Sequence, residues 1–153
     1  MTKRVGDQII FPIIKEGKCS PLASKSKTIK QVCKSIKSAE TRSLDLGMED
    51  SIFMSKMITE MYTGKSGTNE HIPVEMKIDS KTLHDSIESS KQIEEKTIRH
   101  IIAWIKQQKE NNAVNRISWV CSQEMLADIC TKKNANSNDV LLSITNGLIP
   151  KQL

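Results

Sequence analysis

The sequence has few aromatic residues and no long apolar run. Its 153 residues include two Phe, two Trp and one Tyr, so a core has to be built from Ile, Leu, Val and Met. No stretch approaches the roughly 20 consecutive apolar residues that a membrane-spanning helix needs. The basic start MTKRVGDQ is not followed by the apolar segment of a signal peptide. We therefore expect an intracellular protein, cytoplasmic or nuclear, with no membrane partner.

The cysteines are also few and lack the spacing of a metal site. The four of them, at positions 19, 33, 121 and 130, form no C-x-x-C pair and have no histidine at zinc spacing. Disulfides are rare in reducing compartments, so free thiols are expected. What the sequence does have is positive charge, +5 at pH 7 with a pI near 9.0. Such a balance favours a polyanionic partner but does not decide the fold.

Strand and helix patterns alternate along one domain. Apolar residues at 8–14, interrupted by Pro12, predict a strand at a sheet edge, because proline cannot donate to a ladder. Residues 19–26 are expected to form the second arm of a hairpin. The later expected strands are 74–79 and 115–121, and the expected helices are 32–62, 80–89, 91–110, 122–133 and 137–147. This order predicts a mixed α/β sheet with helices packed on it.

Side-chain periodicity also predicts which faces are buried. In the first helix Met54, Met57, Ile58 and Met61 follow helical spacing and are expected to face the core. Trp104 and Trp119 are candidates for stacking on bases, but their spacing favours packing. In the last strand Trp119 alternates with inward-facing residues, so we expect it to be packed and assign neither tryptophan a binding role.

Three carboxylates are placed where they could form a site. Glu40 lies early in the first helix, Asp79 ends the strand 74–79, and Asp128 lies early in the helix after the last strand. Ligands of α/β sheets gather at the carboxyl ends of strands. Three carboxylates there would suit magnesium. The alternative is that these acids only cap helices or interact with helix dipoles.

Three stretches together resemble the ribonuclease H domain of copia-type LTR retrotransposon Pol polyproteins. They are KCSPLASKSKTIKQVCKSIKSAETRSL (18–44), IPVEMKIDSKTLHDSIESSKQIEEKTIR (72–99) and ISWVCSQEMLADICTKKNAN (117–136). The resemblance covers residues 8–147 in order and spacing. It implies one ribonuclease H-like domain over 8–147, with tails at 1–7 and 148–153.

The resemblance also implies a function for the three carboxylates. Glu40, Asp79 and Asp128 match the family's catalytic and metal-binding acids. The family hydrolyses the RNA strand of RNA–DNA hybrids with two Mg²⁺ ions, next to a reverse transcriptase domain in the parent polyprotein. Lys81 and Leu83 match the neighbourhood of the middle aspartate, where we expect them to shape the turn and the core.

The sequence departs from the family pattern at its beginning. The family's first strand, central in its sheet, carries another metal-binding aspartate, and only MTKRVGD stands there; we do not accept Asp7 as its equivalent. Lys77 also stands where the family has an apolar residue. We therefore expect an N-terminally truncated copy without its central strand, inactive by itself. The alternative is a non-catalytic retroelement remnant that binds nucleic acid or a protein partner through its basic surface.

A run of lysines precedes Glu40. Its members are Lys25, Lys27, Lys30, Lys34 and Lys37. If the chain is helical from about residue 30, Lys30, Lys34 and Lys37 share one side. Such a stripe could follow phosphates of a nucleic acid in a salt-sensitive manner. A solvated charged surface is the alternative.

Overall fold

The computed structural model describes residues 4–10, 13–14, 18–19, 22–29, 32–67, 71–90 and 93–121. Its elements are β1 (Arg4–Ile10), β2 (Ile13–Ile14), β3 (Lys18–Cys19), β4 (Ala23–Thr28), α1 (Ile36–Thr63), β5 (Glu75–Ile78), α2 (Lys81–Glu88), α3 (Lys96–Glu110) and β6 (Arg116–Trp119). The predicted order is confirmed from α1 to β6, whereas within the described ranges four short strands precede α1 instead of the two expected. The helices expected at 122–133 and 137–147 lie outside the described residues.

The first strands form the predicted hairpin. β1 pairs with β4 in antiparallel register, Ile10 opposite Ala23, with an irregularity between Arg4 and Asp7. The short strands β2 and β3 also pair in antiparallel register, Ile13 opposite Cys19. The strand expected at 8–14 is thus represented by two strands, β1 and β2, and Pro12 lies outside the described residues. β1 also begins at Arg4, before the expected domain boundary at residue 8.

Helix α1 has a clear cap at each end. The Ser35 hydroxyl accepts a hydrogen bond from the Ser38 amide at 2.9 Å, which makes Ser35 the N-cap. Gly64 ends the helix with φ of 67°, a left-handed conformation that glycine adopts without steric cost, and its N–H donates to the Glu60 carbonyl at 2.8 Å. The start predicted at residue 32 is therefore wrong.

The two halves of α1 bury different kinds of side chain. Leu44 and Met48 are buried in the first half, whereas Ser55 and Thr59 are buried in the second and Met57 and Met61 are exposed. The prediction that those two methionines face the core is wrong. The chain entering β5 lies against this side of α1, and hydroxyl side chains are small and polar enough to bond its backbone.

These bonds concentrate on one residue of the entering chain. Ser55 Oγ donates to the Ile72 carbonyl, and the Ile72 amide donates to Thr59 Oγ1 at 3.0 Å. Two side chains one helical turn apart therefore satisfy both backbone groups of Ile72, where a strand partner would otherwise be needed.

The remaining elements form a strand–helix–helix–strand unit around an isoleucine core. β5 and β6 pair in parallel, Met76 opposite Ile117 and Ile78 opposite Trp119. Helix α3 turns one apolar side inward, as its spacing predicted, and the partly buried Trp104 packs against the same core. The core cluster contains Leu44, Met48, Val74, Ile78, Leu83, Ile87, Ile98, Ile101, Ile102, Ile105, Val114 and Ile117.

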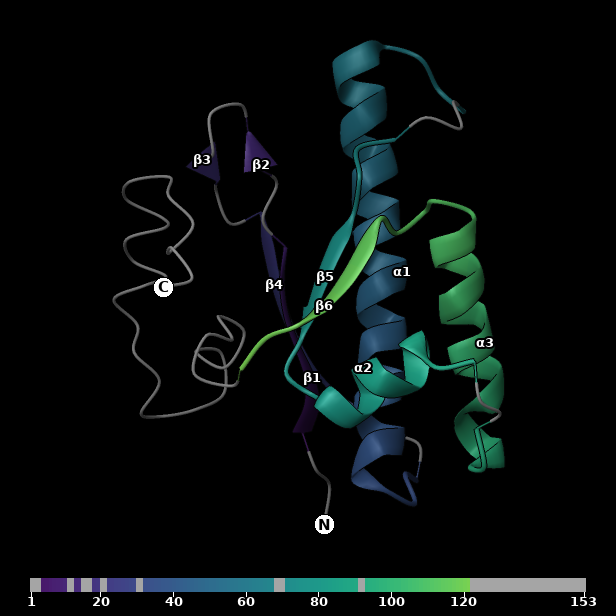
Figure 1. Cartoon of the computed structure of the whole chain (residues 1–153). Helices are drawn as coiled ribbons and strands as arrows, with labels where there is room; N and C mark the ends of the chain where they lie inside the picture. Colours follow the sequence, from purple (N-terminus) through teal and green to yellow (C-terminus); the bar gives the residue numbers. More distant parts are fainter. Residues whose placement is uncertain are drawn as a thin grey trace.

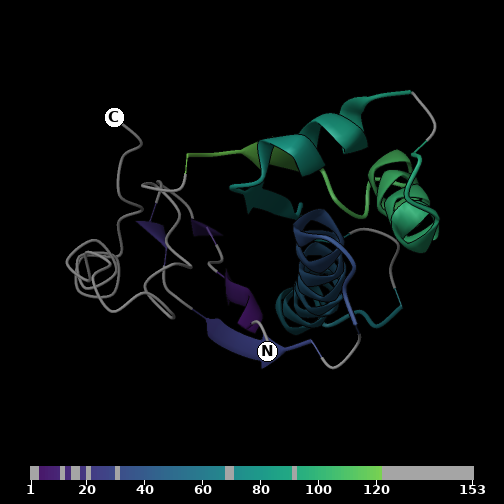
Figure 2. The same cartoon turned by 90° about the horizontal axis from the view of Figure 1, so that it is seen from below.

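In space, α1 lies at the centre of the described structure. Figure 1 shows α1 behind β5 and β6, with α3 alongside it and α2 crossing near the lower ends of the strands. In Figure 2, seen from below, the β1–β4 hairpin and α3 flank α1 on different sides. The mixed α/β class is thereby confirmed, with three helices and a parallel two-stranded sheet. Over the described ranges, no helix is long and apolar enough to cross a membrane.

Candidate functional site

The candidate site lies where β5 and β6 end and α2 begins. Asp79 follows the last residue of β5 and is exposed, and Ser80 is the N-cap of α2. From the end of β6, the indole N–H of Trp119 donates to the Asp79 carbonyl at 3.1 Å. Because parallel strands end at the same edge of a sheet, these residues form its carboxyl edge.

Ser80 connects this edge to Glu40. Its hydroxyl donates to a carboxylate oxygen of Glu40 at 2.5 Å and accepts from the Leu83 amide at 3.4 Å. Glu40 lies one turn into α1 and is half-buried. The structure therefore brings Glu40 to the residue directly after Asp79, although the two acids are far apart in sequence.

The side-chain caps of α1 and α2 bear on the capping part of the alternative for Glu40 and Asp79, whereas the helix-dipole part stays open. The hydrogen-bonding N-cap of α2 is Ser80, not Asp79, and that of α1 is Ser35, not Glu40. Sequence reasoning missed Ser80, although a serine directly before an apolar helix is a recognisable capping signal. Asp128, the third predicted acid, lies outside the described residues.

The oxygen atoms at this edge fit a hard cation. Carboxylates and hydroxyls are ligands of the kind that Mg²⁺ takes, together with water. Within the described part of the chain, no three His, Cys, Asp or Glu residues come close enough together to hold a metal ion. Glu40 and Asp79 are thus the two described acids that could contribute to such a site.

The predicted lysine stripe does not form one helical side. Lys34 precedes the start of α1 at Ile36, so the premise of a helix from residue 30 is wrong. Lys25 forms an ion pair with Asp50 of α1, and Lys37 donates to Ser86 Oγ at 2.6 Å. The side chain of Lys27 and the whole of Lys30 lie outside the described residues.

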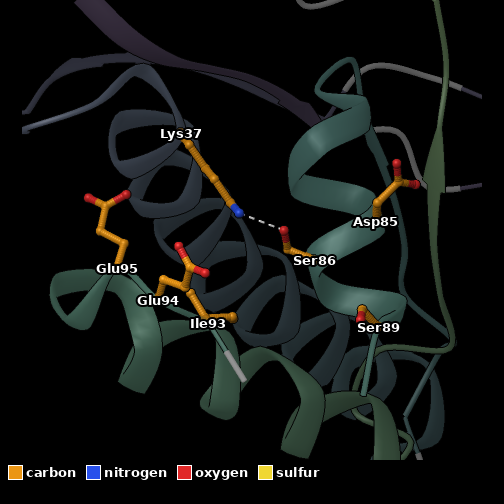
Figure 3. A pocket seen from close by; sticks show the side chains of 7 residues that line it. All are labelled: Lys37, Asp85, Ser86, Ser89, Ile93, Glu94 and Glu95. Carbon is orange, nitrogen blue, oxygen red and sulfur yellow. Dashed lines mark hydrogen bonds between the residues drawn. The ribbon is translucent and has the colours of Figure 1, made fainter. Parts of the chain in front are cut away.

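The surroundings of Lys37 are acidic rather than basic. Figure 3 shows Lys37 reaching from α1 toward Ser86 on α2, above the segment that leads into α3. The pocket at this junction is lined by Lys37, Asp85, Ser86, Ser89, Ile93, Glu94 and Glu95. The pocket lining carries three acidic residues and one lysine, which does not suit phosphate binding, so we do not place the nucleic-acid contact of Lys37 here.

Asp45 is a partly buried carboxylate of α1 that faces charged groups of α1 and α3. The pKa of Asp45 is raised above its usual value, mainly because burial disfavours the charged form, and secondarily because Glu49 is close by. His100 and Arg42 act in the opposite direction. Asp45 thus belongs to the packing of α1 rather than to the carboxyl edge.

Trp119 does not have the environment that periodicity predicted. The residue is 44% exposed, whereas Ile78, its partner in register, is 8% exposed. Trp119 is the last residue of β6, so its ring reaches past the core to the start of α2, where the Lys81 ammonium lies 5.8 Å from the ring centroid. The prediction that Trp119 is packed inside is therefore wrong.

Comparisons with protein-family models, curated proteins and solved structures gave no match to this chain.

Proposed function

We propose that this chain is a ribonuclease H-type domain that binds RNA–DNA hybrids at the carboxyl edge of β5 and β6. The observation that supports it is the hydrogen bond from Ser80 to the Glu40 carboxylate, which places Glu40 beside the residue that follows Asp79. The sequence resemblance selected both acids. The net charge of +5 is consistent with a polyanionic partner.

The residues at this edge have separate roles in the proposal. Glu40 and Asp79 would hold magnesium, which when bound supplies an activated water and stabilises the leaving oxygen of a phosphodiester. Ser80 orients the Glu40 carboxylate through its hydroxyl. The exposed Lys81 places a positive charge beside the acids, where it attracts the phosphate backbone.

We further propose that the 153-residue chain by itself binds hybrids without cleaving them. No residue of this sequence matches the first aspartate of the family pattern. Two-metal hydrolysis needs carboxylates that hold both ions about 3.5–4 Å apart. Without that aspartate, the matched acids Glu40, Asp79 and Asp128 supply one carboxylate fewer than the family pattern uses to hold the two ions.

The test is hybrid binding measured by fluorescence anisotropy with a labelled RNA–DNA duplex, in Mg²⁺ and in EDTA at matched ionic strength. Without a cation, the two carboxylates repel the phosphates. We expect Mg²⁺ to raise the affinity of the wild type. The variant with Glu40→Gln and Asp79→Asn should bind more tightly than wild type in EDTA and gain nothing from Mg²⁺.

Asp85→Asn is the matched control, because it removes one exposed negative charge from α2 away from the carboxyl edge. It should keep the response to Mg²⁺. Absence of hybrid binding in any condition would overturn the proposed function. Equal affinity for hybrid, duplex DNA and heparin would favour non-specific charge binding instead. If the wild type cleaves the hybrid, a chelator stops the cleavage and Asp79→Asn abolishes it, the proposed inactivity is wrong and the proposed magnesium site is supported.

A further inference from the structure

The carboxyl edge carries an exposed aromatic ring that the proposed hydrolytic chemistry does not use. Trp119 is 44% exposed, although the described isoleucines of the neighbouring core are nearly or fully buried. A large apolar ring left in water at a sheet edge is a common feature of binding surfaces, and tryptophan is prominent among binding hot spots.

The ring is held in one orientation rather than left free. Its indole N–H donates to the Asp79 carbonyl at 3.1 Å, and its backbone is fixed by the parallel pairing of β6 with β5. A ring fixed in this way loses little conformational freedom when a ligand stacks on it. The Trp119 surface is therefore preorganised and directly beside the residue proposed to bind magnesium.

Positive charge lies next to the same ring. The ammonium of Lys81 is 5.8 Å from the ring centroid, at the outer limit of cation–π attraction, and Lys81 is exposed. An ammonium group at that distance is available to pair with another anion. An aromatic surface beside a lysine is the combination with which proteins bind single-stranded nucleic acid, one group for a base and the other for a phosphate.

We propose that Trp119 and Lys81 bind an unpaired nucleotide next to the hybrid, the base stacking on Trp119 and its phosphate pairing with Lys81. This inference rests on the proposed function and adds a substrate feature to it. A base within a duplex is already stacked and paired, so the base that stacks on the ring is an unpaired one in a single-stranded flank. The preferred ligand is thus a hybrid with an unpaired overhang.

The experiment compares Trp119→Leu with Trp119→Phe in EDTA, where cleavage cannot contribute. Both variants lose the hydrogen bond to Asp79, so they differ in the aromatic ring alone. With an overhang-bearing hybrid, we expect Trp119→Leu to weaken binding about 5- to 100-fold and Trp119→Phe to stay within about 3-fold of wild type. On a blunt hybrid, the two variants should bind alike. Thermal melts show whether both variants remain folded.

Two further measurements separate the base from the phosphate. Tryptophan fluorescence of the wild type should be quenched by the overhang hybrid, and this quenching should be lost in Trp119→Phe, in which Trp104 remains as an internal reference. Lys81→Gln should reduce the slope of log affinity against log salt by about one.

The possible failures are distinguishable. If Trp119→Leu binds the overhang hybrid as tightly as Trp119→Phe, the stacking inference is wrong and the proposed hybrid binding stands. Quenching of the same size by heparin, which has no bases, would also refute stacking. If the wild type binds no nucleic acid at all, the proposed function fails and this inference fails with it.

Discussion

Replacing Ser80 with alanine tests the contact that holds Glu40 beside the residue after Asp79. The change removes the bond to the Leu83 amide, which caps α2, and the bond to the Glu40 carboxylate. Loss of an N-cap costs about 0.5–2 kcal/mol, and the capping distance of 3.4 Å places this one at the low end. The bond to a charged acceptor contributes about 1 kcal/mol here, below the usual range because the pair is only partly buried.

We therefore expect Ser80→Ala to lower the free energy of unfolding by about 1–2 kcal/mol, equivalent to about 2–8 °C in Tm for a chain of this size. Urea unfolding followed by circular dichroism measures it. Ser80→Thr keeps the hydroxyl and serves as the control. Combining Ser80→Ala with Glu40→Ala in a double-mutant cycle isolates the contact, with an expected coupling of about 1 kcal/mol.

A loss smaller than about 0.3 kcal/mol, together with no coupling to Glu40→Ala, would refute the reasoning, because that result lies within the usual additivity error. It would mean that the Ser80 hydroxyl does not hold Glu40 at the carboxyl edge. The support for the proposed magnesium site would then be gone, whereas the capping of α2 could still be measured separately with Ser80→Gly.

Three other predictions concern the core, the interface and the entry into β5. Ile102→Ala should lower the free energy of unfolding by about 2–5 kcal/mol in urea titrations, because the side chain is fully buried, whereas the exposed Gln107→Ala should change it by less than about 0.5 kcal/mol. Asp45→Asn should raise Tm near neutral pH. The pKa of Asp45 is higher in the folded state than its unfolded-state value of 3.8, so the wild type loses stability as pH rises through the window between these two pKa values. The stability advantage of the variant should therefore shrink in melts at decreasing pH and disappear below that window. Thr59→Val should cost about 1–2 kcal/mol and speed hydrogen exchange of the Ile72 amide, since that N–H loses its acceptor; unchanged exchange would contradict this.

Local patterns predicted most of the elements. The alternation of Met76 and Ile78 with polar residues gave β5, and isoleucine spacing gave the buried side of α3. The hairpin followed from two short strands with a turn between them. Periodicity and turn residues record the local conformation and the buried side of each segment directly, although β5 finds its strand partner in the distant β6.

The start of α1 and its buried side were less predictable. The lysines before Ile36 have a high helix propensity, so the sequence predicts an earlier start. In the structure the Ser35 cap sets the first turn at Ile36. In the second half of α1, the burial of Thr59 instead of Met57 depends on the chain entering β5, which lies against that side. Hydrophobicity alone does not report a polar contact between distant segments.

The sequence by itself determined the mixed α/β class, the order of the elements from α1 to β6 and the choice of Glu40 and Asp79 as candidate acids. Only the tertiary structure decided that Ser80 holds Glu40 beside the residue after Asp79 and that Trp119 remains exposed at the same edge. Periodicity reports the environment within one element. It does not report what happens where a strand runs past its core, as β6 does at Trp119, or where a hydroxyl meets a carboxylate from another helix. Both features arise only when segments that are far apart in the chain pack against each other.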